Sequence, residues 1–205
     1  MDIDITVMLE NIGAVIILMI ISYLIGSTVS AIWVAKFFKL PDPRSFGSQN
    51  PGATNMARSD HKLAAFLTFF LDISKGLLTT GIAIGLGHNL QIAHICGACA
   101  VLGHIYPAYH HFKGGKGAAT YFGVITMISG TCGLLSFSIW AGTLYLFRNS
   151  GLSAVITASV TPILVFSVPE ISHLLPATIL INILIIAKHD QNIKTLLSQK
   201  TSKAS

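Results

Sequence analysis

The chain has 205 residues, of which 52% are hydrophobic and only 10% are charged. Soluble domains carry about 25% charged residues, so this composition excludes an ordinary water-soluble domain. The formal net charge is +5. In so apolar a chain, an excess of Lys and Arg indicates the cytoplasmic side of a membrane protein rather than a surface that binds nucleic acid.

Apolar stretches that suit membrane helices follow one another along the chain. A helix that crosses a bilayer needs about 20 mostly apolar residues. We expect spans at residues 12–35, 63–87, 91–108, 118–131, 132–147, 152–169 and 171–187. The stretch 118–147 carries no charge and suits either one long span or two short ones, because Ser129-Gly130-Thr131-Cys132-Gly133 at its centre resembles a turn.

The distribution of charge favours two spans in that stretch. Twelve of the thirteen Lys and Arg residues lie outside the predicted spans, and Lys75 is the exception. If 118–147 forms two spans, all twelve fall on one face of the membrane, as the positive-inside rule requires. The sequence therefore predicts an all-α integral membrane protein with seven transmembrane helices, its N-terminus outside and its C-terminus in the cytoplasm. We expect one domain over residues 1–205, ending in a short polar cytoplasmic tail at 190–205.

A first candidate site is the loop of residues 42–58. It is rich in Gly, Ser, Asn and Thr, and Arg44 and Arg58 lie near its two ends. Successive backbone N–H groups in such a loop can form an anion-binding nest, and Arg58 can hold a phosphate with two parallel hydrogen bonds. The alternative is an ordinary turn-rich loop.

A second candidate lies within the predicted span 63–87. Asp72 and Lys75 are three residues apart and share a helix face. Charges inside a membrane are costly, so we expect the two to pair and to face the bundle interior, either as a structural ion pair or as support for a functional site. In the same span, the spacing of Gly81 and Gly85 predicts close approach of another helix.

A third candidate is the segment 103–120. Gly-Gly-Lys-Gly at 114–117 opens a predicted helix, whose N-terminus offers free N–H groups to an anion. Lys116 adds a full positive charge. The loop is not a Walker A motif, because Gly117 follows the lysine where Ser or Thr is required. His104, just before this loop, is either a packed histidine or part of the site.

A fourth candidate follows the last span. His189 and Asn192 are three residues apart and point the same way. A polar helix end is the simpler interpretation of these two residues.

Cys96 and Cys99 lie in an apolar stretch and are interpreted as packing residues, because a metal site needs more ligands. No Ser-His-Asp pattern is evident, so the sequence does not suggest an acyl-enzyme intermediate. Together the polar segments predict a phosphate-binding site at one membrane face.

Three motifs resemble those of a known family. Gly-Ser-x-Asn-x-Gly-Ala-Thr-Asn at 47–55 with Arg58, Asp-x-x-Lys-Gly at 72–76, and Gly-His-x-x-Pro with Phe-x-Gly-Gly-Lys-Gly-x-Ala-Thr at 103–120 are similar to the signature motifs of the bacterial acyl-phosphate:glycerol-3-phosphate acyltransferases, the PlsY family. His-x-x-Asn-Ile at 189–193 is similar to the C-terminal segment of that family. The resemblance runs in order over almost the whole chain.

The resemblance implies an enzyme of the bacterial inner (cytoplasmic) membrane whose active site faces the cytoplasm. Such an enzyme transfers a fatty acyl group from acyl phosphate, taken from the bilayer, to the 1-hydroxyl of cytoplasmic glycerol 3-phosphate. The products are lysophosphatidate and inorganic phosphate, in the first step of phospholipid synthesis. The resemblance implies no cofactor and no metal, and it makes the enzyme that produces acyl phosphate a candidate partner, but no nucleic acid.

The resemblance also implies roles for individual residues. Contacts with glycerol 3-phosphate are implied for Ser48, Arg58, Lys116, His189 and Asn192, with Lys116, His189 and Arg58 as the catalytic set. The acyl phosphate would be held by Gly52, Gly114, Gly115, Lys116 and Gly117. The rest of the substrate-binding set, which would support those loops, is Asn50, Thr54, Asn55 and Thr120; Asp72, Lys75 and His104 would support the site from inside the bundle.

Several questions stay open at this level. Gln49 replaces a glycine that is usual in the family, and Gly151-Leu152-Ser153-Ala154 replaces a Ser-Leu-x-Ser segment, so that Ser150 or Ser153 is left as a substitute contact. Either His189 or the donor phosphate can remove the proton of the attacking hydroxyl. An anion transporter and a structural membrane subunit are the alternative functions.

Overall fold

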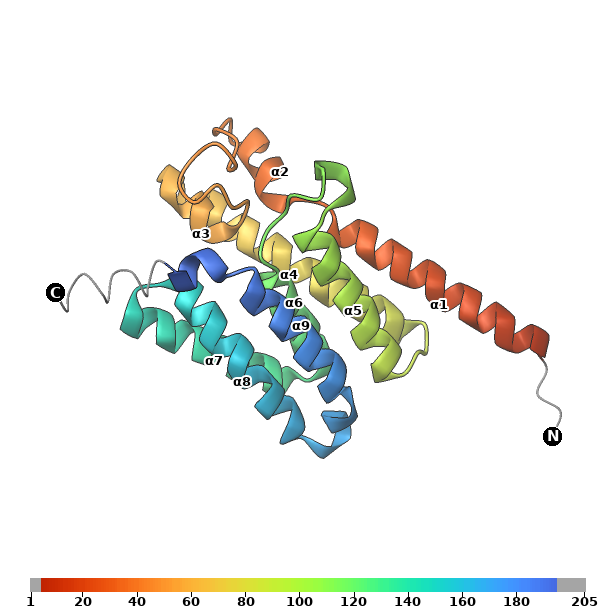
Figure 1. Cartoon of the computed structure of the whole chain (residues 1–205). Helices are drawn as coiled ribbons and strands as arrows, with labels where there is room; N and C mark the ends of the chain where they lie inside the picture. The colour runs from red at the N-terminus through yellow and green to blue at the C-terminus, as the bar shows by residue number, and fades with distance from the viewer. Residues whose placement is uncertain (1–4, 195–205) are drawn as a thin grey trace.

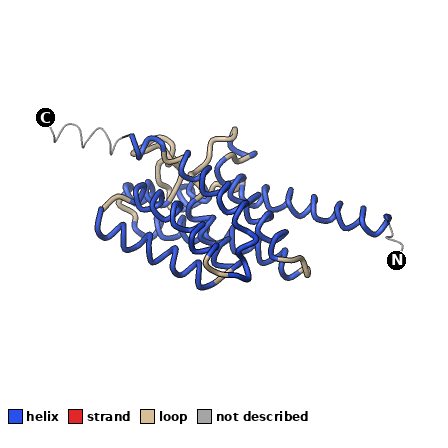
Figure 2. Tube along the Cα trace, turned by 60° about the horizontal axis from the view of Figure 1, so that its bottom comes forward, coloured by secondary structure: helices blue, strands red, loops and turns tan. Residues whose placement is uncertain are grey.

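The computed structural model describes residues 5–194, with side chains from residue 12 onward. Within these residues all the regular secondary structure is helical (Figure 1, Figure 2). The α-helices are α1 (Ile5–Gly26), α2 (Ser30–Phe37), α3 (Ala53–Met56), α4 (Lys62–Gly85), α5 (Leu90–Ile105), α6 (Ala118–Ile128), α7 (Gly130–Phe147), α8 (Ser150–Phe166) and α9 (Leu175–Ala187). Short 3-10 helices are η1 (Ala57–Ser59), η2 (Ala108–His110) and η3 (Pro169–Leu174). Most of the predicted polar tail, residues 195–205 with Lys200 and Lys203, lies outside the described residues.

The helices have the length and composition of membrane segments. Four stretches in the described part are long and apolar enough to cross a membrane: 62–85, 90–110, 130–147 and 169–187. A fifth span results if residues 12–26 and α2, which meet at a bend of 41°, are counted together. The apolar helices α6 and α8 are shorter. Length and composition alone thus support four or five of the seven predicted spans.

The uncharged stretch 118–147 forms two helices, as the charge distribution indicated. The break lies at Ser129, which has an extended backbone (φ −150°, ψ 107°). The Ser129 hydroxyl accepts a hydrogen bond from the Cys132 N–H at 3.3 Å and so caps the start of α7. The two predicted segments 118–131 and 132–147 are therefore separate elements, α6 and α7.

Close helix contact occurs at other glycines than the sequence suggested. Side chains on Gly76 and Gly123 would collide with the backbones of Thr120 and Ile73, so α4 and α6 pack backbone to backbone at this point. Gly81 faces only the side chain of Met127, and a Cβ on Gly85 would have open space. The prediction of close approach at Gly81 and Gly85 is wrong, because α4 packs on α5 through other residues in this region, Thr80 and Ala83, both of which are 0% exposed.

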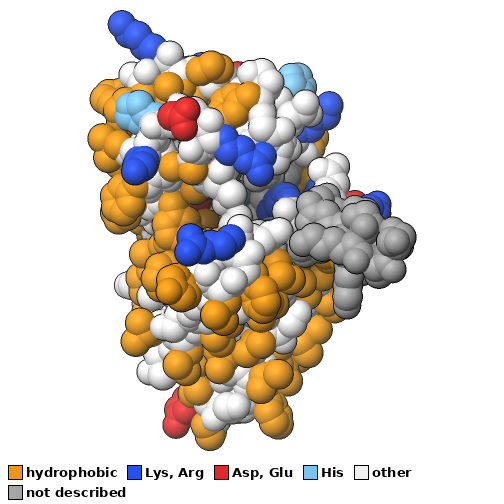
Figure 3. All heavy atoms as spheres, turned by 90° about the vertical axis from the view of Figure 1, so that its left-hand side faces the viewer, with side chains coloured by type: hydrophobic (Ala, Val, Ile, Leu, Met, Phe, Trp, Pro, Cys, Tyr) orange, Lys and Arg blue, Asp and Glu red, His pale blue; other side chains and the backbone are white. Residues whose placement is uncertain are grey.

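The polar loops gather at one end of the bundle. In Figure 1 the loop before α3, the loop around η2, the turn between α7 and α8 and the end of α9 lie toward the upper left. The turn between α4 and α5 lies toward the opposite end, with η3. Figure 3 views the left side and shows Lys and Arg over the upper half and the middle of this face, with hydrophobic side chains covering most of the lower half. The fold therefore brings the basic loops, which are distant in sequence, to a common end.

Candidate active site

The loop between α2 and α3 is held in one shape by the side chain of Asn55. Asn55 Nδ2 donates to the carbonyls of Pro43 (2.7 Å) and Phe46 (3.1 Å), and Asn55 Oδ1 accepts from the Ser48 N–H at 2.8 Å. The side chain is only 1% exposed. Because both ends of the amide bond the loop backbone, Asn55 has the position of a loop support rather than of a direct substrate contact.

Three of the predicted site residues in this loop are accessible. Ser48, Thr54 and Arg58 are all exposed. Arg58 lies against Gly47, where an added Cβ would come within 2.9 Å of Arg58 Cδ. A glycine at position 47 thus leaves room for the arginine. Together these three residues offer two hydroxyl groups and one guanidinium, which is a donor set suited to a phosphate.

The loop also contains backbone turns that glycine usually adopts. Gln49 has φ +57°, in the left-handed region that disfavours residues with a Cβ. This is the position where the family pattern has glycine. The Asn50 carbonyl accepts from the Gly52 N–H at 2.9 Å, which tightens the following turn. Gln49 therefore keeps the loop conformation at some cost in backbone strain.

The glycine-rich loop before α6 folds back onto the end of α5. The Gly115 N–H donates to the His104 carbonyl at 3.0 Å, and the Gly114 N–H is 3.3 Å from the Ile105 carbonyl. These two amides are thus bonded to the last two carbonyls of α5. Gly117 has φ +87° and precedes the first residue of α6, so the chain turns there in a conformation that glycine favours.

Thr120, in the first turn of α6, has a different environment. It is 0% exposed, and its backbone carbonyl packs against Gly76 of α4. The described residues offer no hydrogen-bond partner to its hydroxyl. Its position is in the packing of α6 on α4, beneath the glycine loop.

Lys116 meets the C-terminal segment. Lys116 Nζ donates to Asn192 Oδ1, although the two residues are far apart in sequence. A Cβ on Gly151, at the start of α8, would overlap the Asn192 amide. Burial lowers the pKa of Lys116; the negative charge of Asp190 partly offsets this, and the positive charge of Arg58 adds to it. Three segments thus meet around one half-buried cation.

His189 lies beside this cation in a defined orientation. His189 Nδ1 is 2.8 Å from the Ile185 carbonyl, and the residue is 4% exposed. A carbonyl oxygen only accepts, so Nδ1 carries a proton and the lone pair of the neutral ring is on Nε2. Burial lowers the pKa of His189 to about 4, the Ile185 carbonyl opposes this shift, and the charge of Lys116 reinforces it. At neutral pH the ring is an uncharged group whose Nε2 can accept a proton.

The predicted charge pair inside α4 is present and has a third member. Lys75 Nζ lies 3.0 Å from Asp72 Oδ1, and His104 Nδ1 lies 3.5 Å from the same oxygen. All three side chains are less than 10% exposed. Lys75 Nζ also donates to the carbonyl of Thr28. On its other side, His104 Nε2 occupies the space that a Cβ on Gly115 would need. The buried charges are thereby connected to the glycine loop.

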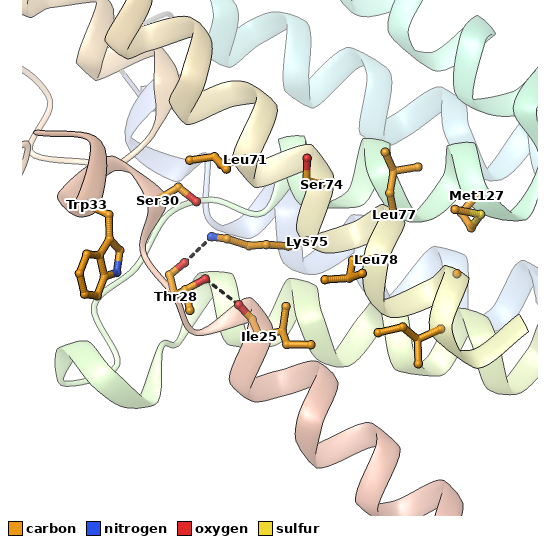
Figure 4. A pocket seen from close by; sticks show the side chains of 12 residues that line it. Ile25, Thr28, Ser30, Trp33, Leu71, Ser74, Lys75, Leu77, Leu78 and Met127 are labelled. Atoms are coloured by element: carbon orange, nitrogen blue, oxygen red, sulfur yellow. Dashed lines mark hydrogen bonds between the residues drawn. The ribbon is translucent and has the colours of Figure 1, made fainter. Parts of the chain in front are cut away.

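A separate apolar cavity of about 830 Å³ lies beside Lys75. Figure 4 shows its lining, which comes mainly from the α1–α2 segment and from α4, with Met127 of α6 at one side. Among the predicted site residues, its lining includes only Lys75. The polar site and this cavity are thus different places in the bundle.

The two serines near the start of α8 are not equivalent. Ser153 is 0% exposed, and its hydroxyl donates to the Asn149 carbonyl at 2.9 Å. Ser150 is partly exposed and directly precedes Gly151, which contacts Asn192. Of the two candidates, Ser150 is the more accessible, and it adjoins the glycine that meets Asn192.

Most of the predicted residues therefore belong to one end of the bundle. Lys116, His189 and Asn192 form its centre, and the charge of Arg58 is close enough to affect Lys116. Sequence reasoning missed Gly151 as a contact of Asn192. The only sequence signal was a glycine in the segment where the family pattern has serine.

Comparison with known proteins shows which family the chain is similar to. Residues 16–199 match the family model described as glycerol-3-phosphate acyltransferase. The glycerol-3-phosphate acyltransferase of Methylococcus capsulatus is 40% identical over 182 residues, which cover 89% of this chain and 92% of the relative. That of Coxiella burnetii is 43% identical over 184 residues, covering 89% and 94%.

A solved structure has the same fold. The crystal structure of PlsY, an integral membrane glycerol 3-phosphate acyltransferase, in its glycerol 3-phosphate form superposes with a TM-score of 0.86 at 36% identity, over 91% of this chain and 94% of PlsY. Sequence motifs, family model and fold agree over nearly the full length. The chain belongs to the PlsY family of integral membrane glycerol-3-phosphate acyltransferases.

Proposed function

We propose that this enzyme transfers a fatty acyl group from acyl phosphate to the 1-hydroxyl of sn-glycerol 3-phosphate and releases lysophosphatidate and inorganic phosphate. The observation that carries the proposal is the contact of Lys116 with Asn192 beside the neutral His189, where the basic loops meet. Crystal structures of PlsY in a glycerol 3-phosphate form and in a lysophosphatidic acid form support this acceptor and this product.

The site suits two anionic reactants that must approach each other. Acyl phosphate and glycerol 3-phosphate repel, and the cations Lys116 and Arg58 screen that repulsion. Acyl phosphate is a mixed anhydride with a good leaving group, so orientation is the main requirement, and it can contribute roughly 7–11 kcal/mol. Donors fixed before the reaction begins stabilise the developing phosphate charge.

The proposed reaction is a direct attack. The hydroxyl oxygen of glycerol 3-phosphate forms a bond to the acyl carbon, and the bond from that carbon to the bridging phosphate oxygen breaks. The phosphate leaves with the electron pair. The hydroxyl proton passes to His189 Nε2, which holds a lone pair, or to the departing phosphate. A hydroxylamine-sensitive acyl-enzyme trapped during turnover would contradict this scheme.

We propose a seven-span topology in the bacterial inner (cytoplasmic) membrane, with the N-terminus outside and the site facing the cytoplasm. The common end of the basic loops supports this orientation under the positive-inside rule. The 11 residues of α6 extend roughly 16 Å, about half of a ~30 Å hydrocarbon layer. The glycine loop at its start is therefore expected to lie below the membrane surface. A fusion of GFP after Ser205 should fluoresce; an expressed but dark fusion would contradict the orientation.

One experiment separates the enzyme from the alternative functions. Purified protein in lipid nanodiscs is mixed with acyl phosphate and labelled glycerol 3-phosphate, and lipid products are separated. An acyltransferase forms labelled lysophosphatidate. An anion transporter forms none but moves labelled phosphate into proteoliposomes, and a structural subunit does neither.

A further inference from the structure

The first membrane segment is broken, and the break has specific partners. α1 ends at Gly26 and α2 begins at Ser30 at an angle of 41°. Irregular backbone at membrane depth is tolerated only where its polar groups find partners. Here the Ser27 N–H donates to the Tyr23 carbonyl at 2.9 Å, and the Thr28 carbonyl accepts from Lys75 Nζ. A cation also suits the C-terminal end of a helix.

The first route from this break to the site passes through the buried charges. Figure 4 shows the Lys75 ammonium directed at Thr28. The same ammonium pairs with Asp72 at 3.0 Å, and Asp72 lies 3.5 Å from His104 Nδ1. His104 packs beneath Gly115 and accepts the Gly115 N–H on its carbonyl. A continuous set of polar contacts therefore joins the break to the middle of the glycine loop.

A second route reaches the beginning of the same loop. The Tyr23 hydroxyl donates to the Tyr106 carbonyl at 2.7 Å. The Ser27 hydroxyl donates to the Tyr23 carbonyl at 2.8 Å and accepts from the Ala108 N–H at 3.2 Å. Tyr106 and Ala108 are the first residues after α5, and the chain runs from them to Lys116. The last turn of α1 and the break thus hold the loop at two points, through Tyr23 and Ser27.

We propose that the helix break at residues 27–29 is a positioning element of the acyltransfer site. It fixes the loop that carries Lys116, and Tyr23, Ser27 and Lys75 are positioning residues that act through this loop. The inference rests on the proposed function, since it assigns these residues a part in that reaction. The proposal also assigns a role to the buried Lys75. Its ammonium bonds the Thr28 carbonyl at the helix break and, through Asp72, orients His104 beneath Gly115.

The test uses two small substitutions that leave the buried ion pair intact. Tyr23→Phe removes the hydrogen bond to Tyr106, and Ser27→Ala removes the one from Ala108. The matched control is Thr157→Val, because Thr157 is buried and its hydroxyl bonds the Ser153 carbonyl of its own helix at 2.8 Å. All variants are compared with wild type in nanodiscs by thermal unfolding, by hydrogen exchange of residues 106–117, and by kcat and KM for each substrate.

A misplacement of ~1 Å can cost roughly 100-fold in rate, so we expect kcat to fall at least ~10-fold in Tyr23→Phe and Ser27→Ala. The Tm and the KM for glycerol 3-phosphate should change little, and the Gly114 and Gly115 amides should exchange faster. Lys75→Met should lower kcat in the same way, and Lys75→Arg should partly restore it. The positioning role is wrong if both variants keep the wild-type kcat or the wild-type exchange rates, or if Thr157→Val loses as much activity.

The two proposals fail in different ways. If wild-type protein makes no lysophosphatidate from acyl phosphate, the proposed function fails, whereas the hydrogen-exchange comparison still tests whether the break positions the loop. If wild type is active and the loop amides of the variants exchange at the wild-type rate, only the positioning role fails.

Discussion

Replacement of Lys116 by Met should separate activity from stability. Lys116 is the cation on which the glycine loop, the C-terminal segment and the start of α8 converge, through its contact with Asn192. Met keeps most of the length of the side chain and removes the charge. The loss of one preorganised donor in an active site typically costs ~10²–10³ in kcat, about 2.7–4 kcal/mol. We expect a loss of this size.

Lys116→Met is expected to lower kcat but not the stability of the fold. Burial lowers the pKa of Lys116 in the folded protein, so folding disfavours its charged form when no substrate is bound. A depressed lysine pKa destabilises the fold fully below the folded-state pKa, and this penalty is lost as pH rises from the folded-state pKa to the unfolded-state pKa. Removing the charge should therefore leave the Tm unchanged or raise it, as is common where function requires a destabilised site.

The assay combines initial rates of lysophosphatidate formation with thermal unfolding of the same nanodisc samples. Lys194→Met is the control, because Lys194 is exposed and its contact, a pair with Asp190 at 3.3 Å, lies at the surface. This control should keep its activity. Near-wild-type turnover by Lys116→Met, or a fall in Tm that accounts for the lost activity, would refute the assigned role.

Three further predictions concern single residues. The pKa of His189 is about 4 in the folded protein and ~6.5 in the unfolded chain, so protonation of His189 should lower the stability of the fold as pH drops from about 6.5 toward 4. His189→Gln should flatten that part of the plot of Tm against pH. A plot that does not change would contradict the lowered pKa. Gln49→Gly should raise the Tm slightly, since relief of ~1–2 kcal/mol of left-handed strain outweighs the ~0.5–1 kcal/mol entropic cost of glycine; a lower Tm would show that the Gln49 side chain is needed. Gly151→Ala should displace the Asn192 amide and raise the KM for glycerol 3-phosphate. The control is Gly142→Ala, which should leave the KM unchanged because an added Cβ there meets nothing within 4 Å. Equal effects of the two substitutions would show that Gly151 is not part of the site.

Apolar length and charge were sufficient to predict the long helices from α4 onward and the division of 118–147. A stretch without charges has no internal boundary signal except its small residues near Ser129, but the placement of Arg148 and the later lysines required an extra crossing under the positive-inside rule. The structure has the break at Ser129. The evidence for this break therefore came from charged residues that lie outside the stretch 118–147.

The break between α1 and α2 was not predicted, for a physical reason. Gly26, Ser27, Thr28 and Ser30 form a short polar interruption, but it contains no Pro, and the apolar residues on both sides suit a continuous helix. What makes the break acceptable is a donor from α4, Lys75, and hydroxyl contacts with the loop after α5. Such tertiary partners have no local sequence signature.

The candidate site was predictable as a set of residues but only in part in its internal roles. Motif positions identified Lys116, His189 and Asn192, because charged and polar side chains are conspicuous next to membrane spans. The family motif implied that Asn55 supports its loop, and the Asn55 side chain does bond the loop backbone. The motif could not show that Ser153 bonds its own helix or that Gly151 meets Asn192. Those distinctions depend on burial and on contacts between segments.

Acyl phosphate as the donor is the central claim, and product stoichiometry tests it most directly. Purified enzyme in nanodiscs is given acyl phosphate and glycerol 3-phosphate, and lysophosphatidate and inorganic phosphate are quantified in the same samples, with acyl-CoA in a parallel reaction. The account predicts equal amounts of both products from acyl phosphate and no lysophosphatidate from acyl-CoA. Lysophosphatidate formed from acyl-CoA, or phosphate released without it, would contradict the account.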